Sequence, residues 1–227
     1  MKKYLSALAI VAGIISGLVG NYSASTPSTS KLLPPGYAFA IWAVIYFTGI
    51  YLAFQLLRGR ISADELGLNL ISLGYLLSGL WIRFDGHQVV VAVIAVGTLA
   101  SNVSAIYFLH KSALSPRLVN LLATFAGWIT IATSLVIADA THISSSSDLK
   151  VAVYLGISLL VALSIYFIFA PVIGYIGTVA WASSSLLFTK STLGTPGFTV
   201  AATGFLVSAA LMARALVGAR LTTSRLS

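Results

Sequence analysis

The sequence predicts an all-α integral membrane protein, and three observations lead to that fold class. Of the 227 residues, 58% are hydrophobic and only 8% are charged, whereas soluble domains carry about a quarter charged residues. The mean hydropathy is +0.99. The apolar residues also fall into successive runs that approach the roughly 20 residues of a membrane-spanning helix. So few polar side chains would not cover the surface of a soluble domain of this length.

We expect about eight membrane-spanning helices. The apolar runs that define them cover residues 4–21, 37–57, 66–82, 88–109, 118–138, 151–170, 172–188 and 198–217. Ser115 and Thr195 each precede a proline, the typical order of a helix N-cap and first helical residue, and Ser-Ala-Asp-Glu at 62–65 has the form of a capping box. Pro171 divides the apolar stretch 151–188, which is too long for one span, so a helical hairpin is predicted there.

The positive charges predict how the chain is oriented. With the N-terminus inside, nine basic residues lie on the inner side (Lys2, Lys3, Arg58, Arg60, Lys111, Arg117, Arg214, Arg220 and Arg225) and four on the outer side (Lys31, Arg83, Lys150 and Lys190). This is the bias of cytoplasmic loops, so we expect both termini in the cytoplasm and the chain in the plasma membrane of a prokaryote. The basic residues form no continuous face, so we expect no nucleic-acid partner despite the net charge of +8.

The first span permits two interpretations. Its basic start and apolar run, followed by Ser-Ala-Ser, resemble a cleaved signal peptide. Gly13 and Gly17, however, have the GxxxG spacing of helices that pack closely in membranes. We favour a retained helix.

The polar residues exclude several kinds of site. The chain contains no cysteine, which excludes disulfides and thiolate metal sites. Its five acidic residues and three histidines lie at span ends or in loops. No acidic pair is therefore placed to hold Mg²⁺, no buried carboxylate is placed to relay protons, and no facing histidines are placed to fix haem. We expect no catalytic residue, no metal site and no covalently bound cofactor.

Aromatic and weakly polar residues remain as candidates for a binding site. Phe39, Trp42 and Tyr46 recur at spacings of three and four residues, so they share one helix face. Similar spacing on the third and fifth spans relates Ser78 to Trp81, and Trp128 to Ala132 with Thr133 beside it. Ordinary helix packing or an interfacial aromatic belt would produce the same spacing, so the residues alone leave both interpretations open.

The segment 34–46, Pro-Pro-Gly-Tyr-Ala-Phe-Ala-Ile-Trp-Ala-Val-Ile-Tyr, resembles the start of the second helix in the TspO/translocator family, the tryptophan-rich sensory proteins. Trp81 falls where the third helix of that family has a tryptophan, and Trp-Ile-Thr-Ile-Ala-Thr at 128–133 resembles its fifth-helix element. Ser78 and Val136 stand where asparagines are usual. The resemblance covers about residues 1–138, and the last three spans lie outside it.

The resemblance implies a five-helix membrane bundle over residues 1–138, with a pocket open towards one membrane face, and an extension of about three spans over residues 139–227. It implies binding of a planar hydrophobic molecule, such as a porphyrin, haem or a sterol- or isoprenoid-like lipid, with transport or sensing as the outcome. The predicted ligand-binding residues are Tyr37, Phe39, Trp42, Tyr46, Ser78, Trp81, Trp128 and Thr133, and the structural motif before them is Pro34, Pro35 and Gly36.

Further expectations follow from the resemblance. Lys31 and Arg83 are candidates to attract porphyrin carboxylates at the pocket opening. Membrane lipid is an expected partner, and a homodimer is one expected state because family members are often dimeric. Light-dependent porphyrin breakdown stays open, since it needs only a nearby tryptophan. Two other functions also stay open: a small-solute secondary transporter completed by the last three spans, and a membrane assembly factor whose aromatic faces contact a partner protein.

Overall fold

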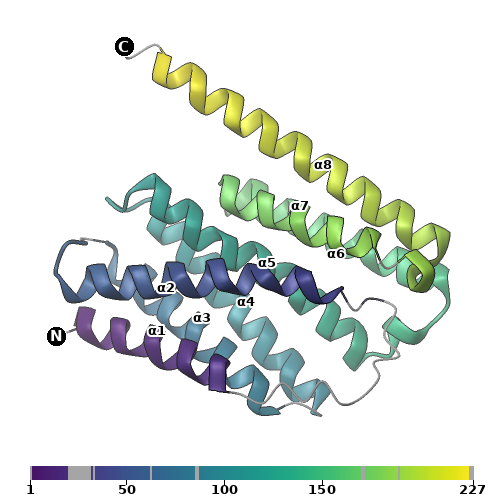
Figure 1. Cartoon of the computed structure of the whole chain (residues 1–227), viewed down its shortest axis with the longest axis horizontal. Helices are drawn as coiled ribbons and strands as arrows, with labels where there is room; N and C mark the ends of the chain where they lie inside the picture. Colours follow the sequence, from purple (N-terminus) through teal and green to yellow (C-terminus); the bar gives the residue numbers. More distant parts are fainter. Residues whose placement is uncertain are drawn as a thin grey trace.

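The computed structural model describes residues 2–19, 32, 34–61, 63–84, 87–169, 172–188 and 190–224. Within these residues the chain is helical (Figure 1). The α-helices are α1 (Lys2–Val19), α2 (Ile41–Leu57), α3 (Glu65–Trp81), α4 (Gln88–His110), α5 (Pro116–Ala140), α6 (Asp148–Ile168), α7 (Ile173–Leu187) and α8 (Lys190–Ser224), with the 3₁₀ turns η1 (Gly36–Ala40), η2 (Ile82–Phe84) and η3 (Ile143–Ser145). Most of the described residues of each predicted span lie on one of these helices, so the predicted fold class is confirmed. Residues 20, 21 and 170, at the ends of two predicted spans, lie outside the described residues.

Helix length divides the helices into two groups. Five segments are long and apolar enough to cross a membrane: Gly36–Leu57, Gln88–His110, Pro116–Ala140, Asp148–Ile168 and Leu193–Val217. The other three helices, α1, α3 and α7, have 18, 17 and 15 residues. They fall below the roughly 20 residues of a full span, and all three pack among the longer helices.

The helix starts follow the sequence signals with one correction. At α5, the Ser115 hydroxyl accepts a hydrogen bond from the Leu118 N–H at 3.3 Å, as predicted. At α3, the Asp64 carboxylate accepts the Gly67 N–H at 2.9 Å. Asp64 therefore caps α3 in the way predicted for Ser62, which lies outside the described residues. Asp64 takes this role because it immediately precedes the first helical residue.

The apolar stretch at the end of the chain is divided as expected. α6 ends at Ile168 and α7 begins at Ile173; Pro171 itself lies outside the described residues. In α8, Gly194 has φ 66° and ψ 173°, which interrupts the helix just before Thr195 and Pro196. The long straight part of α8 therefore resumes where the Thr-Pro pair predicted a helix start.

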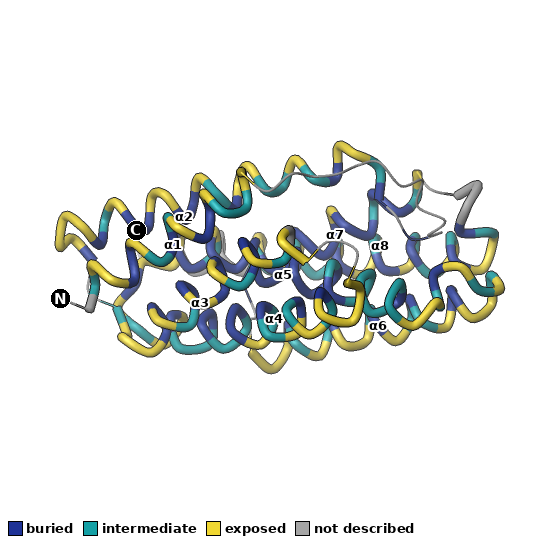
Figure 2. Tube along the Cα trace, turned by 90° about the horizontal axis from the view of Figure 1, so that it is seen from below, coloured by how far each residue is buried: buried dark blue, intermediate teal, exposed yellow. Residues whose placement is uncertain are grey.

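The first five helices form a closed ring. α1 packs against α2 and α3, α3 against α4, α4 against α5, and α5 against α2 (Figure 1). The last three helices join this ring mainly through α5: α7 packs on α5 and α8, and α6 packs on α8, while α7 also contacts η1. Among the five long apolar segments, α5 is consequently the most enclosed: 67% of its apolar stretch is buried, against 17% for α8 (Figure 2).

Small residues bring α1 and α3 into close contact. A Cβ atom at Gly13 would overlap the Tyr75 carbonyl oxygen, and one at Gly79 would overlap the Gly13 carbonyl. The Ser16 hydroxyl donates to the Gly79 carbonyl at 2.8 Å across the same contact. Small residues allow such a close approach of two helices. Of the GxxxG pair, Gly13 faces α3 and Gly17 lies against Tyr46 on α2, so α1 forms one wall of the ring.

Candidate functional site

A cavity of about 200 Å³ lies between α1, α2, α3 and α5. Its walls come from five separate elements and are formed by Gly17, Phe39, Trp42, Tyr46, Ser78, Trp81, Trp128 and Ala132. The cavity sits towards the end of the ring where α1 and α3 finish and α2 begins. Of the eight predicted ligand-binding residues, six therefore converge on one space.

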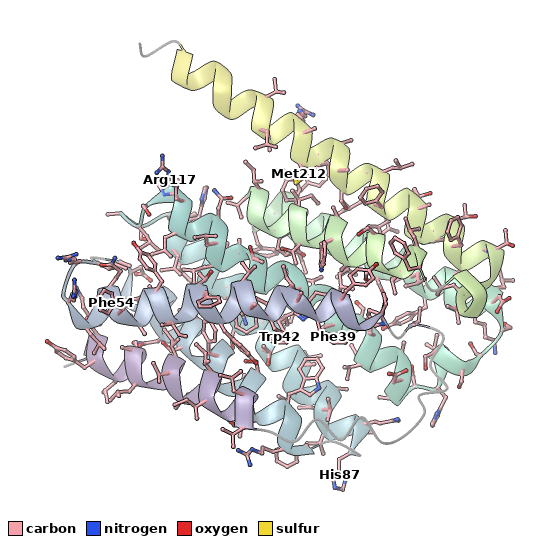
Figure 3. The ribbon with its side chains drawn as sticks, viewed as in Figure 1. Phe39, Trp42, Phe54, His87, Arg117 and Met212 are labelled. Carbon is pink, nitrogen blue, oxygen red and sulfur yellow. The ribbon has the colours of Figure 1, made fainter. Side chains whose placement is uncertain are left out.

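Contacts between aromatic rings fix the positions of the side chains in the cavity wall. Trp42 lies 5.4 Å from Tyr46 between ring centroids, and 5.9 Å from Phe125 behind it. Phe39 meets Trp128 edge-on at 5.8 Å with an interplanar angle of 77°. Edge-to-face and offset geometries are the preferred arrangements of aromatic pairs. Figure 3 shows Phe39 and Trp42 along the first part of the η1–α2 segment.

A buried tyrosine holds α2 in place beneath this wall. Tyr75 on α3 is fully buried, and its hydroxyl donates to the Ile45 carbonyl on α2 at 2.8 Å. Its ring lies 4.8 Å from Phe125 on α5. Gly49 leaves room for the phenol, because a Cβ there would lie 2.8 Å from the Tyr75 hydroxyl oxygen. Tyr75 thus fixes α2 relative to α3 and α5, the helices that carry the cavity walls.

The described lining is uncharged. Its polar groups are the hydroxyls of Tyr46 and Ser78 and the indole N–H groups of the tryptophans. The Ser78 hydroxyl donates to the Tyr75 carbonyl at 2.9 Å, so its oxygen lone pairs remain as acceptors. Trp128 is buried, and its indole nitrogen has no hydrogen-bond partner within the described structure. Such a space suits an apolar ring system with few polar groups.

Two predicted binding residues lie outside the lining. Thr133 is buried, and its hydroxyl donates to the Ala95 carbonyl on α4 at 3.2 Å. Tyr37 is 45% exposed, and its ring packs against Trp181 and Phe188 on the α7 side. Each helical residue rotates about 100° from its neighbour, so Thr133 turns away from the cavity that Ala132 lines. Tyr37, two residues before Phe39, likewise turns outwards.

The Pro-Pro-Gly motif stands at the approach to the cavity wall. Pro35 is extended, with φ −62° and ψ 153°, and its carbonyl accepts the Ala38 N–H at 2.9 Å to start η1. Pro34 is buried. The proline ring fixes φ near this value, and proline has no backbone N–H that would need an acceptor. The two prolines therefore orient the chain at the start of the η1 turn, which carries Phe39.

Two lining residues were absent from the predicted set. Ala132 follows Trp128 by four residues and shares its face. Gly17 belongs to the GxxxG pair, and a Cβ there would meet the Tyr46 hydroxyl oxygen at 2.5 Å. The available signal was the same in both cases: a small residue on a helix face that meets a large aromatic one.

The described lining of the cavity contains no charged residue and no histidine. Among the described residues, no three His, Asp or Glu side chains gather into a metal site. His87 is exposed before α4, at the opposite end of the molecule from Arg117 in Figure 3. Arg83 is exposed in η2, two residues after Trp81. Lys31, the other basic candidate, lies outside the described residues.

The TspO/MBR family model matches residues 5–139. The chain belongs to the TspO/MBR family. The match runs from α1 to the end of α5, so the resemblance seen in segment 34–46 is confirmed, and the chain is an integral membrane protein of this family. α6, α7 and α8 of this TspO/MBR protein lie beyond the match. Comparisons with curated proteins and with solved structures gave no match.

The helices beyond the family match enclose a second, much smaller cavity. It measures about 30 Å³ and lies among α5, α6, α7 and α8, where Ser134, Ser158 and Ser183 contribute hydroxyls. The Ser134 and Ser158 hydroxyls donate to carbonyls of their own helices at 3.1 and 3.0 Å. A cavity of this size accommodates about one water molecule.

Proposed function

We propose that this TspO/MBR protein binds a planar hydrophobic molecule in the cavity between α1, α2, α3 and α5, as the first step of its transport or sensing. The observation that carries the proposal is the convergence of aromatic side chains from η1, α2, α3 and α5 on one uncharged space. Ligand sites are typically apolar concave spaces with a few placed polar groups, and aromatic walls stack well on flat rings.

The dimensions of the cavity refine the ligand class. At about 200 Å³, it is smaller than the roughly 300–1,000 Å³ of pockets for drug-sized ligands. This supports a compact ring system, an isoprenoid or sterol end, or one edge of a tetrapyrrole with its macrocycle partly outside. The carboxylates of a porphyrin would then point out of the uncharged cavity, towards the end of the ring where exposed Arg83 lies.

An unpaired donor in the wall also supports ligand binding. A buried N–H without a partner is costly, and the Trp128 indole is such a group among the described residues. An acceptor on the edge of a bound ring would satisfy it after a small side-chain adjustment. This would favour a ligand with a carbonyl, ether or ring nitrogen over a pure hydrocarbon.

The proposal predicts saturable porphyrin binding that depends on the wall tryptophans. Titrating detergent-purified protein with protoporphyrin IX, followed by tryptophan quenching, is expected to saturate near one ligand per chain. Trp42→Phe and Trp128→Phe should each weaken binding about two- to tenfold, because phenylalanine offers a smaller ring surface than tryptophan and lacks the indole N–H donor.

The matched control is Phe47→Leu, which alters an aromatic residue on the same α2 helix. Phe47 is 73% exposed on the lipid-facing side, so its loss should leave the binding curve unchanged. Linear quenching without saturation, equal in all variants, would show that the porphyrin only partitions into the micelle. Solute uptake into proteoliposomes would then be the next measurement, because that result would favour the alternative function as a small-solute transporter.

We also propose that the chain lies in a prokaryotic plasma membrane with both termini in the cytoplasm, and that it forms a homodimer as family members often do. The helix order supports the orientation. Lys3, Arg58, Arg60, Lys111 and Arg117 fall at one end of the bundle, and Arg83 and Lys150 fall at the other. Basic residues concentrate on the cytoplasmic side of membrane proteins.

The orientation is testable because the chain has no natural cysteine. Ala113→Cys lies between α4 and α5, Ser145→Cys lies in η3 between α5 and α6, and both positions are exposed. A membrane-impermeant maleimide should label the Ser145→Cys variant in intact cells, and the Ala113→Cys variant only after permeabilisation. The reverse pattern would invert the proposed topology.

A further inference from the structure

Helix α7, which lies beyond the family match, contacts the turn that leads into the cavity wall. The Trp181 indole N–H donates to the Ala38 carbonyl at 3.1 Å, across 143 positions of sequence. The Tyr37 ring packs edge-on against Trp181 at 5.9 Å and against Phe188 at 5.7 Å. α7 and the residue after it therefore hold the outer side of η1 by one hydrogen bond and two aromatic contacts.

The inner side of the same turn forms part of the cavity. Phe39 follows Ala38 directly, lines the cavity and meets Trp128 at 5.8 Å. Within three consecutive residues, the chain contacts α7 on one side and the binding cavity on the other. Movement of η1 away from α7 would displace Phe39 and change the opening of the cavity.

α7 is itself firmly fixed to the ring. The Gly174 N–H donates to the Asn120 side-chain oxygen at 3.2 Å. The hydroxyls of Tyr175 and Thr130 lie 3.0 Å apart in a buried hydrogen bond. A Cβ at Gly127 would lie 3.1 Å from the Thr178 side chain and would overlap the Tyr175 carbonyl. The backbones of α5 and α7 are thus in direct contact, so α7 is a rigid support for η1.

We infer that α7 clamps the entrance turn of the cavity, with Trp181 as the positioning residue, and so controls how fast a ligand enters and leaves. The inference rests on the proposed function for its ligand, but the clamp itself is a property of the apo protein. It gives the extension a role that a five-helix bundle lacks: the turn carrying Phe39 is held from both sides. Trp181 touches the turn and not the cavity, so it acts through Ala38 and Tyr37.

The clamp is tested without ligand by hydrogen exchange of residues 36–42. Trp181→Phe keeps an aromatic ring but removes the N–H donor to Ala38. Because one hydrogen bond is lost, we expect exchange in this segment to become about three- to tenfold faster. The control is Ser184→Ala, one turn further along α7, which removes only a hydrogen bond to the Trp181 carbonyl within α7. Equal exchange in Trp181→Phe and wild-type protein would overturn the inference.

The control of ligand exchange is tested by displacement of bound protoporphyrin IX. The dissociation rate should rise about three- to tenfold in Trp181→Phe and stay unchanged in Ser184→Ala. Faster hydrogen exchange with an unchanged dissociation rate would overturn the role in ligand release. If wild-type protein shows no saturable binding, the proposed function fails, and the hydrogen-exchange result alone still decides whether the clamp exists.

Discussion

Replacing Gly174 by alanine is expected to force α7 away from α5 and to lower the free energy of unfolding by about 3 kcal/mol. The added Cβ would overlap the Asn120 carbonyl oxygen, which belongs to the backbone near the start of α5 and cannot move aside by a change of rotamer. A shift of α7 would lengthen the Gly174 N–H bond to the Asn120 side chain and the contact between Tyr175 and Thr130.

Gly156 provides the matched control for this prediction. It lies inside α6, and a Cβ there would meet no atom within 4 Å. Gly156→Ala should be neutral or stabilising by up to about 1 kcal/mol, because alanine is the better helix former. Unfolding in detergent, followed by circular dichroism, compares the two variants. Equal midpoints would show that α5 and α7 are not in backbone contact.

The same substitution links stability to the binding site. α7 carries Trp181, so a displaced α7 also loses the hydrogen bond to Ala38. Gly174→Ala should therefore reproduce the faster exchange of residues 36–42 expected for Trp181→Phe, from a position about two turns before Trp181 on α7.

The helices were predictable because their signals are local. Apolar runs of sufficient length and Ser-Pro or Thr-Pro pairs at their starts depend only on neighbouring residues, and Ser115 caps α5 as expected. The cap of α3 shows the limit of this reasoning. Ser62 and Asp64 are both suitable N-cap acceptors and lie two positions apart. Which of them caps the helix depends on the backbone conformation of the residues before it, and the local sequence does not fix that conformation.

The site was predictable in part, for a geometric reason. Spacing identifies residues that share a helix face, as Phe39, Trp42 and Tyr46 do, and the closed ring turns that face inwards. Spacing does not identify what the residues beside that face contact on other helices. Thr133 therefore contacts α4, and Tyr37 contacts α7. The role of Trp181 had no signal in the sequence, since its partner lies 143 positions away.

α5 combines two functions because two of its faces are occupied by different neighbours. Trp128 and Ala132, four residues apart, face the cavity. Gly127 and Thr130, three residues apart, face α7. Residues at such spacings lie on one side of a helix, and the two pairs are offset by about 150° around the axis of α5. A single rigid helix thus forms a cavity wall and also carries the extension that clamps the entrance.

Ala132→Phe is expected to abolish ligand binding while the protein remains folded. Ala132 lies half-buried in the wall of a cavity of about 200 Å³, so a phenyl ring there would fill much of the space that a flat ligand needs. We expect the Kd for protoporphyrin IX to rise at least about 100-fold, which corresponds to roughly 2.8 kcal/mol at 1.4 kcal/mol per factor of ten. The same titration used for the tryptophan variants measures it.

Leu121→Phe is the control, because Leu121 lies on the same helix and is 45% exposed away from the cavity. It should bind the porphyrin like wild-type protein. Circular dichroism and gel-filtration profiles equal to those of wild-type protein must accompany the loss of binding in Ala132→Phe, so that unfolding does not account for it. If a folded Ala132→Phe protein still binds with wild-type affinity, the ligand lies elsewhere, and the lipid-facing surface of the bundle becomes the site to examine.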